Sequence, residues 1–426
     1  MSVSAVLLGT LGALFLLDVP VAVGIGLASL AAFVYQGDFP LITAVQRIYG
    51  GVDSFPLMAV PLFLYAGGLM ETGGISRRVV AFADALVGWL PGGLAAVAVV
   101  SAMFFAGISG SAAADTAAVG GILIPAMIGR GYAPSFAGAV QAAGGSIGVV
   151  IPPSIPMIIF GFLTGASIGR LFAGGILPGV LMGVSLVAVS VFVSRRQGYG
   201  ASQTFSALRV WRTFREALWA LGAPVVILGG ILGGVFTATE SAAVAVGYAF
   251  LVGMFLYREL RWKDVPGIFI RGSITAAVIL FIIASASAFS WLLAIEDIPA
   301  ALSRELLSIT DSPVLLLLLV NAVLLLAGTF VETTASLILL VPVIVPLAPK
   351  LGIDLTQLGV IVVMNLAIGM LTPPLGICLI VSCSLSNERL AAISRAVLPF
   401  LAVLLIDLLL VSFWSPLTTW LPALTK

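Results

Sequence analysis

Apolar segments long enough to cross a lipid bilayer follow one another along almost the whole chain, and this constrains the fold more than any other feature. A membrane-spanning helix needs about 20 mainly apolar residues. Such segments occur near residues 3–17, 21–36, 56–71, 78–100, 170–194, 219–235, 238–257, 268–295 and 396–414. Only 9% of the 426 residues are charged, so most of the outer surface must face lipid. The sequence therefore predicts an all-α polytopic membrane protein.

The residue types that are missing or rare exclude several classes of function. Histidine is absent, which removes the commonest zinc ligand and the commonest general base. No intramembrane pair of aspartates has the spacing of a protease, so we expect no enzyme and no cofactor. A net charge of +1 leaves no basic surface for nucleic acid. Cys378 and Cys383 allow a metal or redox pair, although ordinary membrane-helix cysteines fit their apolar segment better.

The most polar connection, residues 195–216, contains five arginines and one acidic residue. The positive-inside rule places it in the cytoplasm. Aromatic and aliphatic residues spaced among the arginines predict a short amphipathic helix on the membrane surface. This basic linker divides the chain into two membrane repeats, residues 1–194 and 217–426.

The two halves carry the same marker residues at a constant offset of 221 positions. The markers in the first half are Gly107, Pro125, Gly148 and Pro152-Pro153, and their counterparts are Gly328, Pro346, Gly369 and Pro373-Pro374. Long membrane repeats that are interrupted at matching positions are typical of secondary transporters, which bind solute at the interruptions. With an odd number of crossings in each repeat, we expect the two repeats to be inverted.

The first polar interruption predicts a re-entrant helical hairpin over about residues 94–128. Each arm is too short to span the membrane, and the tip carries the small and polar residues Ser109, Gly110, Ser111 and Asp115. Non-helical backbone at membrane depth survives where protein buries it or where it lines a wet cavity. Hydroxyl and carboxylate oxygens suit sodium, and the alternative for Asp115 is a helix N-cap or first-turn acid.

The second interruption predicts a broken transmembrane helix over about residues 134–164. Paired prolines break a helix because they lack backbone donors, and glycines let the backbone approach an ion. The candidate residues for binding sodium or substrate are Gly145, Ser146, Gly148, Pro152, Pro153 and Ser154. A purely structural proline kink is the alternative.

The second half supplies matching elements, a hairpin over about residues 313–348 and a broken helix over about residues 355–386. The candidate binding residues are Thr329, Glu332, Thr333, Thr334, Asn365, Gly369, Thr372, Pro373 and Pro374. Glu332 aligns with Ser111, and an ionisable residue at membrane depth is a functional candidate by default. Glu240 and Glu71 are expected at a helix cap or an interface.

The motifs resemble those of the large membrane subunit of the tripartite ATP-independent periplasmic (TRAP) transporters, in the ion-transporter superfamily. They are, in order, Ser54–Phe63, Ser109-Gly110-Ser111 with Asp115, Arg130-Gly131-Tyr132, Ile151–Ser154, Phe236–Glu240 and Leu371–Pro374. The resemblance covers nearly the whole chain. One departure is Ala238, where the family pattern has proline, and it affects scaffold packing more than the ion site.

The resemblance implies sodium-driven uptake of a small organic acid across the bacterial inner membrane by an elevator-type motion. It also implies two partners on separate polypeptides, a small four-helix membrane subunit and a periplasmic substrate-binding protein. A self-sufficient sodium/dicarboxylate carrier of the same superfamily is the alternative. The sequence does not select the acid, because the binding protein does so in this family.

Overall fold

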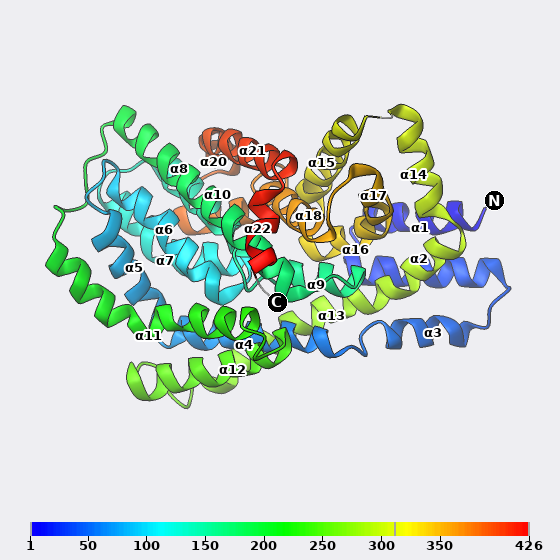
Figure 1. Cartoon of the computed structure of the whole chain (residues 1–426), viewed down its shortest axis with the longest axis horizontal. Coiled ribbons are helices and arrows are strands. Elements are labelled where there is room, and N and C mark those ends of the chain that lie inside the picture. The colour runs from blue at the N-terminus through cyan, green and yellow to red at the C-terminus, as the bar shows by residue number, and fades with distance from the viewer. Residues whose placement is uncertain (1, 311, 425–426) are drawn as a thin grey trace.

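The computed structural model describes residues 2–310 and 312–424, and the regular structure in that part of the chain is helical throughout (Figure 1). Eight of the described helices are long and apolar enough to cross a membrane, or ten if each of two sharply bent helix pairs counts as one span. The prediction of an all-α polytopic chain is therefore confirmed.

The first half contains ten helices and two short turns of 3-10 helix. They are α1 (Val3–Leu16), α2 (Val21–Gln36), α3 (Leu41–Gly50), η1 (Phe55–Met58), α4 (Ala59–Thr72), α5 (Ile75–Val87), α6 (Gly93–Ser109), α7 (Ala112–Gly129), α8 (Pro134–Ser146), η2 (Ile147–Val149), α9 (Ile155–Thr164) and α10 (Ile168–Gln197).

The described part of the second half begins after an irregular segment over residues 198–206. Its elements are α11 (Ala207–Leu232), α12 (Ala238–Leu251), η3 (Val252–Leu256), α13 (Val265–Ile295), α14 (Ile298–Ile309), α15 (Pro313–Phe330), α16 (Thr333–Ile344), η4 (Val345–Leu347), α17 (Ala348–Leu351), α18 (Leu355–Gly369), α19 (Ile377–Ser386), α20 (Leu390–Ala396), α21 (Leu398–Phe413) and α22 (Pro416–Leu424).

Each half contains a pair of helices joined by a two-residue tip, followed by a helix interrupted at a proline pair. The pairs are α6–α7 and α15–α16, and the interrupted helices are α8–α9 and α18–α19. The offset of 221 positions in the sequence holds for the helix starts, since α7 and α16 begin 221 residues apart and so do α8 and α18. The Pro152-Pro153 and Pro373-Pro374 peptide bonds are both cis.

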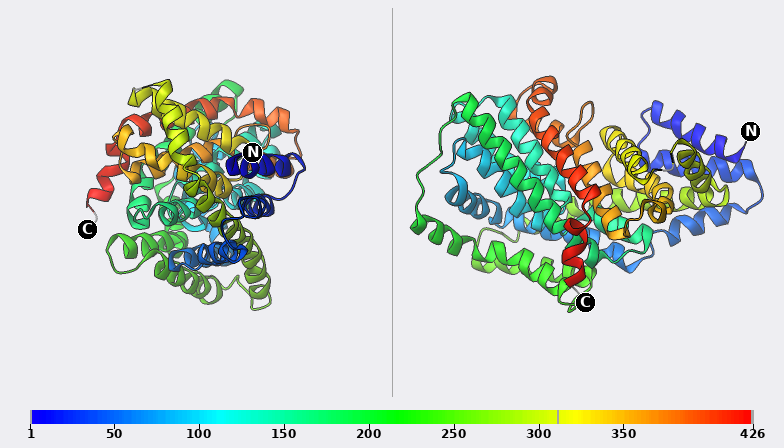
Figure 2. Two further views of the ribbon diagram at one scale, coloured as in Figure 1. Left: turned by 90° about the vertical axis from the view of Figure 1, so that its right-hand side faces the viewer. Right: turned by 45° about the horizontal axis from the view of Figure 1, so that its top comes forward.

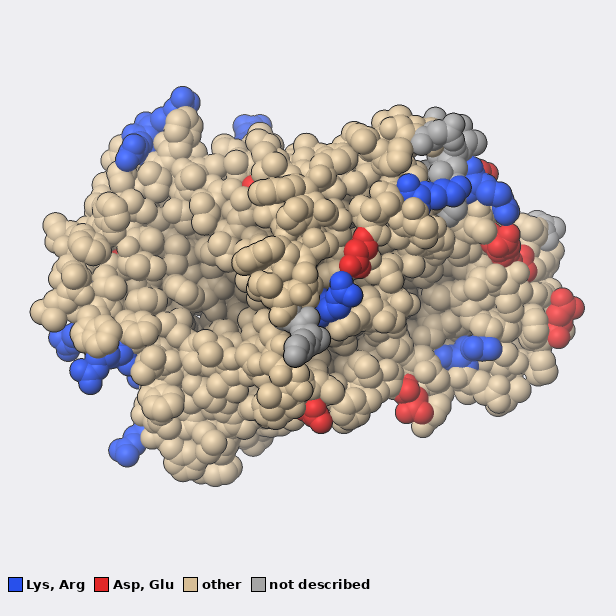
Figure 3. Space-filling view, viewed as in Figure 1, with Lys and Arg blue, Asp and Glu red and all other residues tan. Residues whose placement is uncertain are grey.

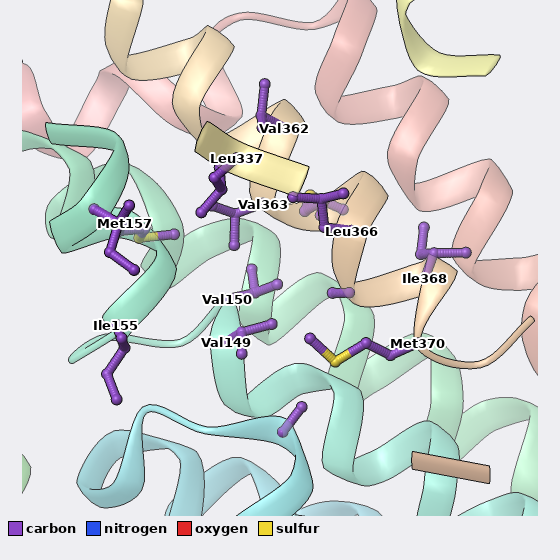
Figure 4. Packing of buried hydrophobic residues seen from close by; sticks show 14 of the residues in the cluster. Val149, Val150, Ile155, Met157, Leu337, Val362, Val363, Leu366, Ile368 and Met370 are labelled. Carbon is purple, nitrogen blue, oxygen red and sulfur yellow. The ribbon is translucent and has the colours of Figure 1, made fainter. Parts of the chain in front are cut away.

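The two halves interlock through these interrupted helices. The second segment α19 packs against α7 and α8 of the first half, and α9 packs in the same way against α16 and α18 of the second. Figure 4 shows Met157 of α9, Leu337 of α16 and Val363 of α18 in this shared core, and all three are fully buried. The core of the molecule is therefore formed by both repeats together.

Two sequence expectations are wrong in detail. The span expected near residues 78–100 is divided, because Gly88, Pro91 and Gly92 end α5 before α6 starts, and Gly92 takes a left-handed conformation with φ +69°. The separate surface helix expected in the basic linker is instead the first part of the 26-residue helix α11. Its residues contain no glycine or proline before Gly222, so nothing stops the helix as it enters the membrane-spanning segment.

The segments that follow the two hairpins lie at opposite ends of α10. Beyond α7, Arg130 donates a hydrogen bond of 2.8 Å to the Ser202 carbonyl, just past the C-terminal end of α10. Beyond α17, Asp354 pairs at 3.1 Å with Arg170, near the N-terminal end of α10. At 1.5 Å per residue the 30-residue helix α10 is about 45 Å long, which is more than the hydrocarbon thickness.

The surface agrees with a membrane environment. Charged side chains are sparse on the face seen in Figure 3, and large apolar side chains such as Leu326, Val184 and Phe192 are exposed. Figure 1 and the right-hand view of Figure 2 place α1 and α2 at one end of the long axis and the start of α11 at the other.

We predict that the residues after the two hairpins face opposite sides of the membrane. Arg130→Cys and Lys350→Cys both place a thiol at an exposed position. In oriented vesicles, with Cys378 and Cys383 replaced by alanine, a membrane-impermeant maleimide should label one variant only from outside and the other only after permeabilisation. Labelling of both variants from the same side would show parallel repeats.

Candidate functional site

A cavity of about 100 Å³ lies between the two hairpin tips and the two helix breaks. Four of the residues that line it are the first residues of four different helices, namely Ala112 of α7, Ile155 of α9, Thr333 of α16 and Ile377 of α19. The first N–H groups of a helix have no partner within the helix, and the helix dipole gives this end a partial positive charge. The ends of α7, α16 and α19 therefore favour an anion, whereas at α9 the Ile155 N–H already donates to the Gly110 carbonyl oxygen at 3.4 Å and Pro156 has no N–H. The Glu332 carboxylate, which also lines the cavity, opposes an anion.

The tip of the first hairpin packs directly against the first helix break. Gly110 has φ +65°, which favours glycine, and a Cβ atom there would lie 2.6 Å from the Pro153 carbonyl oxygen. Pro152, Pro153 and Ser154 are all buried. This tip is therefore fixed against the break by backbone contact.

Asp115 lies in the first turn of α7 and is completely buried. The hydroxyl of Ser109 donates a hydrogen bond to its Oδ1 atom. Its Oδ2 atom has no hydrogen-bond partner among the described residues. Ser111, rather than Asp115, caps the helix through the Ala114 N–H. Asp115 is thus the first-turn acid of α7 and not its N-cap, and its buried carboxylate oxygen without a partner calls for a cation or a proton.

The polar atoms near Asp115 are oxygens, from one hydroxyl and one backbone carbonyl. Both the Ser109 hydroxyl and the Ser111 carbonyl oxygen lie beside the carboxylate, with 3.5 Å between these two atoms. No cluster of three or more His, Cys, Asp or Glu side chains able to hold a metal ion occurs in the described residues. One carboxylate with neutral oxygens is a ligand set for a hard cation of low charge.

Two glycines of α8 and η2 allow this arrangement. A Cβ atom on Gly148 would lie 2.1 Å from Oδ2 of Asp115, and one on Gly145 would lie 1.9 Å from Oγ1 of Thr116. Both positions therefore exclude any larger residue unless α7 moves. Ser146 donates a hydrogen bond to the Ala143 carbonyl oxygen, so its hydroxyl is paired within its own helix α8.

Ser154 also has a local role. Its hydroxyl donates to the Val149 carbonyl oxygen at 2.5 Å and accepts a hydrogen bond from the Met157 N–H at 3.3 Å. The side chain thereby links the two segments of the interrupted helix and caps α9.

Glu332 takes the N-cap position of α16 and lines the central cavity. Its carboxylate accepts hydrogen bonds from the N–H groups of Thr334 at 2.8 Å and Ala335 at 3.2 Å, and from the Thr334 hydroxyl at 3.1 Å. The side chain remains exposed on the cavity side, whereas Thr333 and Thr334 are buried. Unlike Asp115, Glu332 is held by the backbone and faces the space where a solute would enter.

Three predicted site residues of the second half point elsewhere. Thr329 and Thr372 donate to backbone carbonyls of their own segments and line a separate groove of about 540 Å³ between α15, α18 and α21. Asn365 donates to the Asn321 side chain of α15 at 2.9 Å, within the core. None of the three lines the central cavity.

The remaining predicted residues form the second break. A Cβ atom on Gly369 would lie 2.5 Å from the Gly328 carbonyl carbon, so this glycine allows α15 and α18 to touch. Pro373 and Pro374 are exposed, in contrast to the buried proline pair of the first half. The two breaks therefore differ in their access to solvent.

Sequence reasoning missed Arg271 and expected Glu71 at a helix cap or an interface, but both lie beside the site. Glu71 of α4 and Arg271 of α13 line a second cavity of about 160 Å³, which shares Leu64, Ser111 and Thr275 with the central one. A charge inside an apolar span was the signal that could have identified Arg271. Glu240, by contrast, forms the expected cap, because it and Thr237 make a reciprocal capping box at the start of α12.

The chain matches a known protein family and is similar to known proteins over most of its length. Residues 8–417 match the family described as "Tripartite ATP-independent periplasmic transporter, DctM component". The C4-dicarboxylate TRAP transporter large permease protein DctM of Pseudomonas aeruginosa is 40% identical, over 88% of each chain. The sialic acid TRAP transporter large permease protein SiaM of Vibrio cholerae is 38% identical, over 98% of this chain and 97% of its own length.

A longer relative and a solved structure extend the comparison. The isethionate TRAP transporter permease protein DctMQ of Oleidesulfovibrio alaskensis is 40% identical over 98% of this chain, which spans only 65% of that protein. The crystal structure of the YdaH transporter of Alcanivorax borkumensis has a TM-score of 0.58 at 16% identity and covers 90% of this chain and 88% of its own. At that identity the structural match shows a shared fold only.

We predict that a methyl group at Gly148 disrupts the Asp115 site. Gly148→Ala should lower the thermal denaturation midpoint of the purified chain, because overpacking costs about 1–3 kcal/mol. It should also abolish stabilisation by sodium chloride relative to potassium chloride. Gly121→Ala is the control, because a Cβ atom there meets nothing within 4 Å. A Gly148→Ala chain that sodium stabilises as much as the unchanged protein would refute the assignment.

Proposed function

Because the chain belongs to the DctM family of tripartite ATP-independent periplasmic transporters, we propose that it takes up a small organic acid using the sodium gradient. The family relationship and the membrane-spanning helices make it a multi-pass protein of the bacterial inner membrane and a secondary transporter of organic acids. Sodium as the coupling ion, the two partner proteins and the elevator-type mechanism are proposals.

The observation that carries the proposal is the convergence of four helix N-termini on the central cavity. An organic acid crosses the membrane as a carboxylate, whose charge must be balanced where water is excluded. The N–H groups of Ala112 and Thr333, which have no acceptor among the described residues, offer hydrogen bonds and positive potential from the two hairpin tips. The substrate carboxylate would therefore bind between these tips.

Sodium would supply the remaining positive charge. Asp115 binds the ion in this proposal, together with the Ser109 hydroxyl and the Ser111 carbonyl oxygen. The ion would neutralise a carboxylate that otherwise has no partner for Oδ2 in the described structure. Because Ser111 both lines the cavity and caps α7, occupation of the ion site would fix the tip to which the acid binds. This gives a physical reason for coupled binding.

Transport would require the hairpins and interrupted helices to move as a unit against the remaining helices. A cleft of about 580 Å³ separates the loop around Gly165 from Phe55 and from the loop around Thr237. Where the hairpin tip meets α4, a Cβ atom on Gly67 would lie 3.5 Å from the Ser109 Cα atom, an ordinary van der Waals contact. An elevator-type displacement, as the resemblance implies, would move the tip along this contact.

The chain would work with two partners. The similar proteins of Pseudomonas aeruginosa and Vibrio cholerae are named large permease proteins, and the isethionate relative is longer than this chain. We infer that a small four-helix membrane subunit and a periplasmic substrate-binding protein complete the transporter. The binding protein would select the acid.

Reconstitution tests the proposal and its alternative. Proteoliposomes that contain the chain and the small subunit should accumulate labelled acid only with the loaded binding protein and an inward sodium gradient. Asp115→Asn should reduce the initial rate at least tenfold, because a neutral amide binds sodium weakly. Uptake that runs equally well on a proton gradient in potassium would contradict sodium coupling. Saturable uptake by the chain alone would favour the self-sufficient carrier.

A further inference from the structure

Arg271 places a positive charge beside the substrate cavity, and no salt bridge holds it among the described residues. It lies six residues into α13, and its side chain is exposed to the second cavity. It makes no ion pair with an acidic residue in the described part of the chain. An arginine within a membrane-spanning helix is costly, and such residues usually mark a solute pathway.

The second cavity continues the central one toward the basic end of the molecule. Leu64, Ser111 and Thr275 line both cavities. From there the second cavity follows α13 back toward its N-terminal end, past Arg271 to Ile268. The segment just before α13 contains Arg258, Arg261 and Lys263, so the positive-inside rule places this end in the cytoplasm.

Glu71 is the one acidic residue that lines this second cavity. It comes from α4, and the charge of Arg271 acts on it electrostatically across the cavity. The two groups form no ion pair in the described structure, so an incoming carboxylate would not have to break a salt bridge. Glu71 would compete with that carboxylate for Arg271 and keep its binding weak.

We propose that Arg271 forms a second carboxylate-binding subsite, on the cytoplasmic side of the central cavity, with Glu71 as its built-in competitor. This inference rests on the proposed function and adds a residue that binds the anionic solute. A guanidinium presents a planar set of donors that matches a carboxylate, so binding would be specific for acids. A competing carboxylate lets the solute leave, which a transport path requires.

The geometry places Arg271 next to the hairpin tip, on the route of a released carboxylate. Thr275 is one helical turn from Arg271 on the same face of α13 and lines both cavities. The Ser109 and Ser111 residues of the hairpin tip face Arg271 across the second cavity. A carboxylate released from the hairpin tip would therefore meet Arg271 next on its way to the cytoplasm.

Charged thiol reagents test the subsite without knowledge of the substrate. In a chain with Cys378→Ala and Cys383→Ala, Thr275→Cys places one reactive thiol between the two cavities. The rates of modification by a sulfonate methanethiosulfonate (anionic) and by a trimethylammonium methanethiosulfonate (cationic) are measured. Arg271→Gln should lower the ratio of the anionic to the cationic rate about tenfold, because the reagents respond oppositely to a nearby charge. Arg261→Gln, an exposed control, should change the ratio less than twofold.

Glu71→Gln keeps the test decisive if Arg271→Gln fails to fold. It removes the competing charge and should raise the same rate ratio several-fold. A ratio that neither variant changes would overturn the subsite and leave Arg271 and Glu71 as a structural pair.

Transport assays distinguish a failure of this inference from a failure of the proposed function. In the reconstituted transporter, Arg271→Gln should raise the KM for the acid about tenfold without changing the KM for sodium, and Arg271→Lys should recover part of the loss. If the unchanged transporter shows no sodium-driven uptake, the proposed function fails, whereas the reagent ratio still reports on the subsite. If uptake is normal in Arg271→Gln, only the subsite is wrong.

Discussion

A helix that ends inside a membrane must bury or hydrate its unpaired backbone groups. The rest of this structure depends on how four helices bury or hydrate their N-terminal ends. Lipid offers no hydrogen bonds, so each such end costs several kcal/mol unless protein or a wet cavity receives it. The hairpin tips and the helix breaks bring α7, α9, α16 and α19 to one place. The cavity that accommodates these ends is, for the same reason, suited to an anion.

The two repeats share a backbone plan but differ in the chemistry of their side chains. The first tip has Ser111 as its cap and a buried Asp115, whereas the second has Glu332 as its cap and Ser336 at the position equivalent to Asp115. One carboxylate is thus enclosed between helices and the other faces the cavity. An ion and an organic acid need different surroundings, and in the proposed function the divergence of the repeats would provide both within one frame.

The interruptions expected from the sequence fall where described helices end, because small residues at the tips and proline pairs leave few conformational choices. It failed where a helix end depended on weaker signals, as at Gly88 and Gly92, or where no breaking residue separated a surface segment from a span, as in α11. The family relationship indicated by the motifs is confirmed by the match over residues 8–417.

Side-chain direction was harder to predict than backbone position. Thr329, Thr372 and Asn365 lie in the right elements, but their side chains face α15, α18 or α21 because helix rotation is set by tertiary packing. Arg271 was missed for a related reason. Its meeting with Glu71 depends on how α4 and α13 pack, and these helices are about 200 residues apart in the sequence.

A cryo-electron microscopy map of the chain with its small subunit, sodium and the acid that the binding protein selects would test the central claim most directly. The account predicts density for the carboxylate within hydrogen-bond distance of the N–H groups at the starts of α7 and α16, and a sodium ion beside Asp115. Density for the acid in the outer cleft around Phe55 and Thr237, with none between the hairpin tips, would contradict it.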